Sequence, residues 1–102
     1  MAEKHVPSWD EVREQLGASW NSTMEGERNP WDQVEEAAHF GYEQGLRLGR
    51  LGADWDDVKD DIQAEWEQNV PHPRWESWYE AEDAAHLGFH RAIEELSRTR
   101  AA

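Results

Sequence analysis

The chain has 102 residues, of which 23 are acidic and 10 are basic, so its formal net charge is -13. This charge disfavours direct contact with nucleic acid or anionic lipid, whose surfaces are also negative. The absence of cysteine excludes disulfides and thiolate metal sites, and the short apolar runs exclude a membrane span. Seven tryptophans favour a folded chain, because large aromatic side chains need a core in which to be buried. We therefore expect one small domain over residues 1–102, with a cytoplasmic location by elimination.

The first predicted helix covers about residues 9–20. Its large apolar residues fall at positions i, i+3, i+7 and i+11, which lie on one stripe of an α-helix, and they are Trp9, Val12, Leu16 and Trp20. Ser8 and Glu11 have the spacing of a capping box. The helix is therefore expected to begin immediately after Ser8.

The second predicted helix covers about residues 30–49. Asn29 and Pro30 provide an N-cap followed by proline at the first helical position, and Gly49 and Gly52 mark its end. Its interior contains a row of small residues four positions apart, namely Ala37, Gly41 and Gly45. Glycine inside a helix costs about 1 kcal/mol relative to alanine. The two interior glycines therefore indicate a close approach to another helix backbone.

The third predicted helix covers about residues 55–68, where Asp54 and Asp57 form an acidic counterpart of the first capping box. The fourth covers about residues 74–98 and follows two prolines at positions 71 and 73. It has its own row of small residues, namely Ala84, Gly88 and Ala92. This second row matches the first in spacing and therefore predicts the same kind of contact.

An internal repeat relates these elements. Residues 9–20 (WDEVREQLGASW) match residues 55–66 (WDDVKDDIQAEW) at a shift of 46 positions, with five identities. Residues 31–42 (WDQVEEAAHFGY) match residues 78–89 (WYEAEDAAHLGF) at a shift of 47 positions, with six identities. Eleven identities in 24 ungapped positions are far above chance. The change of shift by one position indicates an insertion between the two blocks, where a loop belongs.

Together these patterns predict an all-α fold of four helices, arranged as two tandem helical hairpins related by a pseudo-two-fold axis. Repeat 1 covers about residues 8–49 and repeat 2 covers about residues 54–98, and each contributes one short and one long helix. We expect the two long helices to cross through their rows of small residues. The short helices would then cover this crossing with their tryptophans.

A histidine occupies the same place in both repeats, at His39 and His86. Each follows an acidic residue by three positions, and Glu-x-x-His on facing helices holds the metals of di-iron bundles. However, the helical wheel places these acids, Glu36 and Asp83, away from the rows of small residues. We therefore interpret both histidines as structural residues at the core boundary, each bonded to a neighbouring carboxylate or carbonyl.

Repeat 2 adds His90, so that Asp83, His86 and His90 lie on one helical face at i, i+3 and i+7. Such a trio can hold zinc or nickel. His90 aligns with Glu43, so the trio is absent from repeat 1. A histidine–carboxylate metal protein is therefore one alternative function. No nucleophile–base pairing or phosphate loop is present, so we expect neither enzymatic activity nor a bound cofactor.

Two surfaces are candidates for contacts with partners. Phe40 and Leu87 follow the repeated histidines on a second side of their helices, and Leu51 points the same way. Apolar residues on two sides of a helix indicate two neighbours, which here are either a short helix of the same chain or another subunit. Trp75 has no counterpart in repeat 1 and is a further candidate for an exposed aromatic contact.

The other surface is acidic and lies on the third predicted helix, at Asp56, Asp57, Asp60 and Asp61. These acids could simply be solvated, with the first-turn residues favoured by the helix dipole. They could also imitate the phosphates of DNA and block a basic DNA-binding protein. That imitation requires the acids of both short helices to lie on one continuous surface.

The pattern W-x2-V-x3-[LI]-x3-W, followed by a helix with A-A-H-[FL]-G-[YF], resembles short bacterial helical-repeat proteins of unknown function. The tryptophan-flanked part is also similar to CsbD-like stress proteins. These resemblances imply a helical fold and a stress context, without known catalytic residues. We therefore hypothesise a non-enzymatic interaction or stress-accessory module, which forms a homodimer or binds another protein of basic character. A nucleic-acid mimic and the metal protein are the alternatives.

Overall fold

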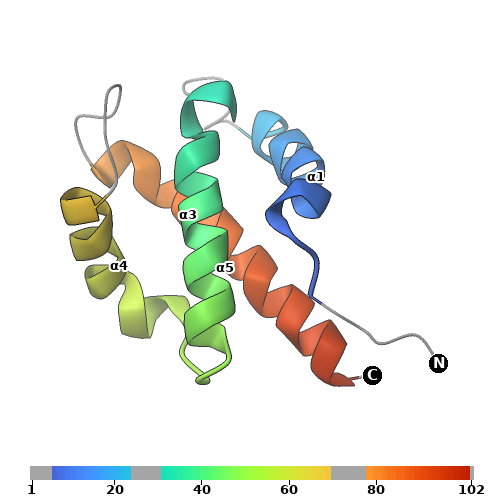
Figure 1. Ribbon diagram of the computed structural model, residues 1–102. Helices are drawn as coiled ribbons and strands as arrows, with labels where there is room; N and C mark the ends of the chain where they lie inside the picture. The colour runs from blue at the N-terminus through green and yellow to red at the C-terminus, as the bar shows by residue number, and fades with distance from the viewer. Residues whose placement is uncertain (1–5, 24–30, 70–77, 102) are drawn as a thin grey trace.

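The computed structural model describes residues 6–23, 31–69 and 78–101 (Figure 1). These residues contain no strand and form four helices, which are α1 (Trp9–Asn21), α3 (Trp31–Gly49), α4 (Trp55–Asn69) and α5 (Trp78–Ala101). The all-α prediction is confirmed, and each predicted helix end that the structure describes is correct to within three residues. The predicted starts at residues 30 and 74 lie outside the described residues. None of the described helices combines the length and the apolar character that crossing a bilayer requires.

The two short helices begin with the predicted caps. At the start of α1, the backbone N–H of Ser8 donates to Oε2 of Glu11 at 2.6 Å. At the start of α4, the backbone N–H of Asp57 donates to Oδ1 of Asp54 at 3.1 Å. Such bonds satisfy the N–H groups that the first turn of a helix leaves without an intrahelical partner.

The end of α3 is a tight turn at the predicted glycines. The backbone N–H of Gly52 donates to the carbonyl oxygen of Gly49 at 3.0 Å, and Gly52 has a φ of 84°, which side-chain-bearing residues rarely adopt. Leu51 lies within this turn, with 79% of its surface exposed. It therefore does not continue the helical face of Phe40, because the helix ends two residues before it.

The two long helices, α3 and α5, cross in close contact through their rows of small residues (Figure 1). A Cβ atom on Gly41 would overlap the backbone carbonyl of Ala85, and a Cβ atom on Gly88 would overlap that of Ala38. These obstacles are backbone atoms, so they cannot move aside by changing a rotamer. The prediction that the glycines permit two helix backbones to touch is therefore confirmed.

The two short helices, α1 and α4, lie on opposite sides of the α3–α5 pair (Figure 1). Their tryptophans are buried in the hydrophobic core and are Trp9, Trp20, Trp55 and Trp66. A hydrophobic core built of large rings around a centre of alanine and glycine explains how so polar a chain folds. The aromatic side chains supply apolar area that the crossing itself lacks.

Candidate functional site

The repeated histidines stack on the tryptophans that begin the short helices. The imidazole of His39 lies on the indole of Trp9, with ring centroids 4.7 Å apart and an interplanar angle of 5°. His86 lies on Trp55 in the same way, at 4.6 Å and 7°. Each histidine therefore fixes a short helix against its own long helix. The same histidine–tryptophan contact therefore occurs at the equivalent positions of both repeats.

The residues beside the two histidines differ between the repeats. Nε2 of His39 lies 3.2 Å from Oε2 of Glu43, which agrees with the expectation of a carboxylate partner. In repeat 2 the position of that glutamate is occupied by His90. Burial lowers the pKa of His86 from its usual value, and the neighbouring His90 lowers it further, whereas Asp83 acts in the opposite direction. Burial and the neighbouring His90 therefore favour the neutral form of the His86 imidazole.

The second apolar side of α3 is covered within the chain. The ring of Phe40 meets that of Trp66 on α4 edge-on, with centroids 5.5 Å apart and an interplanar angle of 65°. Edge-to-face contact is a preferred arrangement of aromatic rings. Of the two neighbours that the sequence allowed for Phe40, the described contact is therefore with a short helix of the same chain.

The corresponding place in the other half of the molecule contains a groove between α1 and α5. It has a volume of about 540 Å³ and a mostly apolar lining, which includes Ser19, Trp20, Thr23, Asp83, His86, Leu87 and His90. We name this site the α1–α5 groove. Leu87 aligns with Phe40, and Trp20 aligns with Trp66, so the groove lies where the other half has its aromatic pair. Its volume is within the range of small-ligand sites, roughly 300–1,000 Å³.

The rim of the α1–α5 groove is negative. The last turn of α1 contains no basic residue, and the carbonyl end of a helix carries a partial negative charge. The hydroxyl of Thr23 donates to the carbonyl oxygen of Trp20 at 2.6 Å, so it is engaged in ending the helix. The exposed carboxylate of Asp83 adds a full charge. The groove therefore combines an apolar floor with a rim that suits a cation.

The three predicted metal ligands line this groove together but do not form a metal centre. No group of three or more histidine, aspartate or glutamate residues is placed to hold a metal ion within the described residues. The stack on Trp55 fixes the plane of the His86 imidazole, so this ring cannot turn freely toward Asp83 and His90. A shared helical face at i, i+3 and i+7 is therefore not sufficient to bring the donor atoms of these three residues together.

The predicted interaction surface is divided between several places. The four aspartates of α4 are exposed, Phe40 and Leu87 are half-buried on opposite halves of the molecule, and Trp75 lies outside the described residues. The acids of α1 and those of α4 are on helices that the α3–α5 pair separates (Figure 1). Imitation of DNA, which requires the acids of both helices to form one continuous surface, stays a prediction.

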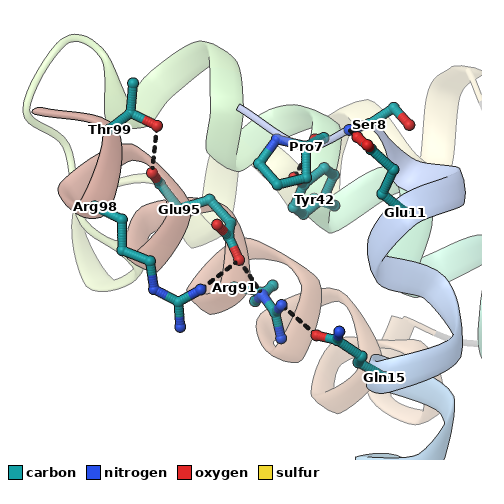
Figure 2. A network of polar contacts seen from close by, with 9 residues as sticks. All are labelled: Pro7, Ser8, Glu11, Gln15, Tyr42, Arg91, Glu95, Arg98 and Thr99. Atoms are coloured by element: carbon teal, nitrogen blue, oxygen red, sulfur yellow. Dashed lines mark hydrogen bonds and ion pairs between the residues drawn. The ribbon is translucent and has the colours of Figure 1, made fainter. Parts of the chain in front are cut away.

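A polar network on α5 was not predicted from the sequence (Figure 2). The carboxylate of Glu95, whose side chain is only 6% exposed, accepts bonds from Arg91 at 2.6 Å and from Arg98 at 3.2 Å. Arg91 also donates to Oε1 of Gln15, which ties α5 to α1. A signal was present, since Glu95 aligns with the apolar Leu48 of repeat 1 and has arginines four positions before and three positions after it.

Tyr42 lies beside this network. Its hydroxyl donates to the carbonyl oxygen of Pro7 at 2.5 Å and so fixes the segment that enters α1 (Figure 2). Burial raises the pKa of Tyr42 to about 12, and the negative charge of Glu95 contributes to the rise. This end of the molecule is therefore tied together by polar bonds, whereas the α1–α5 groove presents a surface suited to binding.

No protein-family model matches the chain, and neither a curated protein nor a solved structure matches it.

Proposed function

We propose that this protein is a non-enzymatic interaction module that binds a basic protein partner through its acidic surface. The observation that carries this proposal is the exposed face of α4. Asp56, Asp60 and Asp61 are exposed, and none of them forms an ion pair with a basic side chain in the part of the chain that the structure describes. Their charge is therefore available to a partner.

The positions of these acids favour binding over a contribution to stability. Asp56 and Asp60 are four positions apart, as are Asp57 and Asp61, and like charges at this spacing destabilise a helix by roughly 0.2–0.5 kcal/mol per pair. The helix dipole favours acidic residues in the first turn of a helix. Asp60 and Asp61 lie beyond the first turn of α4, so they do not gain this stabilisation. A net charge of -13 adds long-range attraction for a basic protein.

The test is capture of proteins from a bacterial lysate at low and high salt. A variant with Asp56→Asn, Asp60→Asn and Asp61→Asn is compared with the wild type. The matched control, Asp10→Asn with Glu14→Gln and Glu36→Gln, removes the same charge from exposed positions on other helices. We expect the wild type and the control to recover a basic protein at low salt and the α4 variant to lose it. Equal recovery by all three proteins contradicts the proposal.

The homodimer and the stress context stay predictions. Phe40 was one reason to expect a second subunit, but it packs against Trp66 of its own chain, so it does not require one. Sedimentation of the purified protein over a range of concentrations checks the dimer. A monomer at the highest concentration would contradict it.

A further inference from the structure

We propose that the α1–α5 groove binds an aromatic side chain carried by a basic segment of a partner protein. This inference rests on the proposed function, because it names the site at which a basic partner would be anchored. The acidic face of α4 would attract such a partner at long range. The groove would supply the short-range contact that selects one segment over another.

The other half of the molecule indicates the kind of side chain that the groove would take. There, Phe40 packs a ring edge-on against Trp66, and its ring lies in the chain itself. In the α1–α5 half, the aligned residue is Leu87, which has no ring, and the place beside it is a groove of about 540 Å³. A ring supplied by a partner would occupy the place beside Leu87 that corresponds to the ring of Phe40 in the other half.

The charges around the groove indicate what should flank that ring. Asp83 and the carbonyl end of α1 make the rim negative. The imidazole of His86, stacked on Trp55, contributes a polar surface to the groove. A lysine or arginine beside the aromatic residue would therefore be attracted, and an acidic residue would be repelled.

An aromatic anchor inside a charged rim is also the usual composition of a binding hot spot. Such anchors carry most of the affinity of a protein interface when they enter a well-packed pocket, and the surrounding charges mainly set specificity and association rate. The groove offers one such pocket in a molecule whose other large apolar side chains are mostly buried, Leu51 being the exposed exception within the described residues.

The test uses three synthetic peptides, blocked at both ends, and follows the signals of Leu87 and His86 by NMR. The first peptide has one phenylalanine between paired lysines, the second has alanine in its place, and the third has glutamates in place of the lysines. We expect the phenylalanine peptide to bind at least about tenfold more tightly than the alanine peptide, the change that burial of one large apolar side chain gives. Equal affinities of these two peptides, or tight binding of the glutamate peptide, overturn the proposal.

Two variants locate the binding. Leu87→Phe copies Phe40 into the groove and should reduce the affinity for the phenylalanine peptide to that of the alanine peptide, without loss of thermal stability. Ser19→Trp fills the groove from the exposed side of α1, and it provides the same test should Leu87→Phe disturb the fold. If both variants fold and bind the phenylalanine peptide as the wild type does, the groove is not the site.

The outcomes for the groove and for the acidic face are distinguishable. If the phenylalanine and alanine peptides bind equally while the α4 variant loses its captured protein, the proposed function stands and the groove proposal fails. The α4 variant could instead capture the same proteins as the wild type, while Leu87→Phe and Ser19→Trp abolish tight binding of the phenylalanine peptide. The groove proposal then stands, and the acidic face is not the attracting surface. N-acetyl-phenylalanine amide is the final probe, and binding as tight as that of the phenylalanine peptide would contradict the role of the basic flanks.

Discussion

Repeat 1 and repeat 2 build the same centre but different edges. In both, a tryptophan stacks on the repeated histidine, and a glycine of each long helix meets the backbone of the other. At the edges, Phe40 fills a place that Leu87 leaves open, and the buried Glu95 takes the position of Leu48. The difference teaches that one helix packing can support two different surfaces. The crossing of two backbones tolerates no larger side chain, whereas positions around the crossing accept different residues.

The largest expected effect breaks the shared centre. Gly41→Ala and Gly88→Ala each insert a Cβ atom into a backbone carbonyl of the opposite helix, so each should cost about 3 kcal/mol or more, at the upper end of overpacking. Urea unfolding followed by circular dichroism measures the loss. Ala64→Gly at an exposed position of α4 is the control and should cost about 1 kcal/mol through helix propensity alone. A glycine that accepts alanine would show that the two repeats do not share this contact.

The next effect concerns the polar network of repeat 2. Glu95→Gln removes a buried charge and leaves Arg91 without its carboxylate, so it should cost about 2 kcal/mol. The double change Glu95→Leu with Arg91→Gln copies Leu48 and Gln44 of repeat 1, and it should cost less than the single change, because replacing both partners of a buried pair is often neutral. Thermal unfolding compares the two. If the double variant is less stable than the single one, apolar packing cannot replace the polar network in this fold.

Glu95→Gln should also change the pKa of Tyr42, which a purely structural role of Glu95 would leave unchanged. Glu95→Gln removes a negative charge that helps to raise the pKa of Tyr42 to about 12. The pKa of Tyr42 should therefore fall, although it stays above 10 because burial is the larger cause. Absorbance of the tyrosinate measures it, with Tyr42→Phe as the control that assigns the signal. Because the pKa of Tyr42 is raised on folding, its contribution to stability is present below pH 10 and is lost as the pH rises through 12.

The centre could be predicted from the sequence, and the edges could not. Apolar spacing, caps and glycine rows are local or repeated signals, so they predicted all four helices and the crossing of α3 with α5. The groove depends on contacts between residues of different repeats. Trp66 of repeat 2 contacts Phe40 of repeat 1. In the other half, Trp20 of repeat 1 lines the groove together with Leu87 of repeat 2. Sequence periodicity does not predict these contacts, because they depend on how the short helices lie across the long ones.

A smaller effect tests the aromatic edge through stability alone. Phe40→Leu copies Leu87 into repeat 1 and removes the ring contact with Trp66, so it should cost about 1 kcal/mol. The reverse change, Leu87→Phe, should cost nothing, because the added ring enters an existing groove. Urea unfolding of both variants measures the difference. Equal losses would indicate that the two edges are equally full and that the comparison between them is mistaken.

The smallest effect concerns the histidine edge. His90→Glu copies Glu43 of repeat 1, so it replaces a neighbour that lowers the pKa of His86 by an acidic residue. The pKa of His86 should rise, although burial continues to oppose protonation. Because the pKa of wild-type His86 is lowered on folding, its contribution to stability is present above its unfolded value and is lost as the pH falls through the folded value. Imidazole NMR titration measures the shift, and the loss of stability on acidification should be smaller in the variant. An unchanged pKa would show that position 90 does not act on the histidine, and that the repeats differ there in sequence but not in electrostatics.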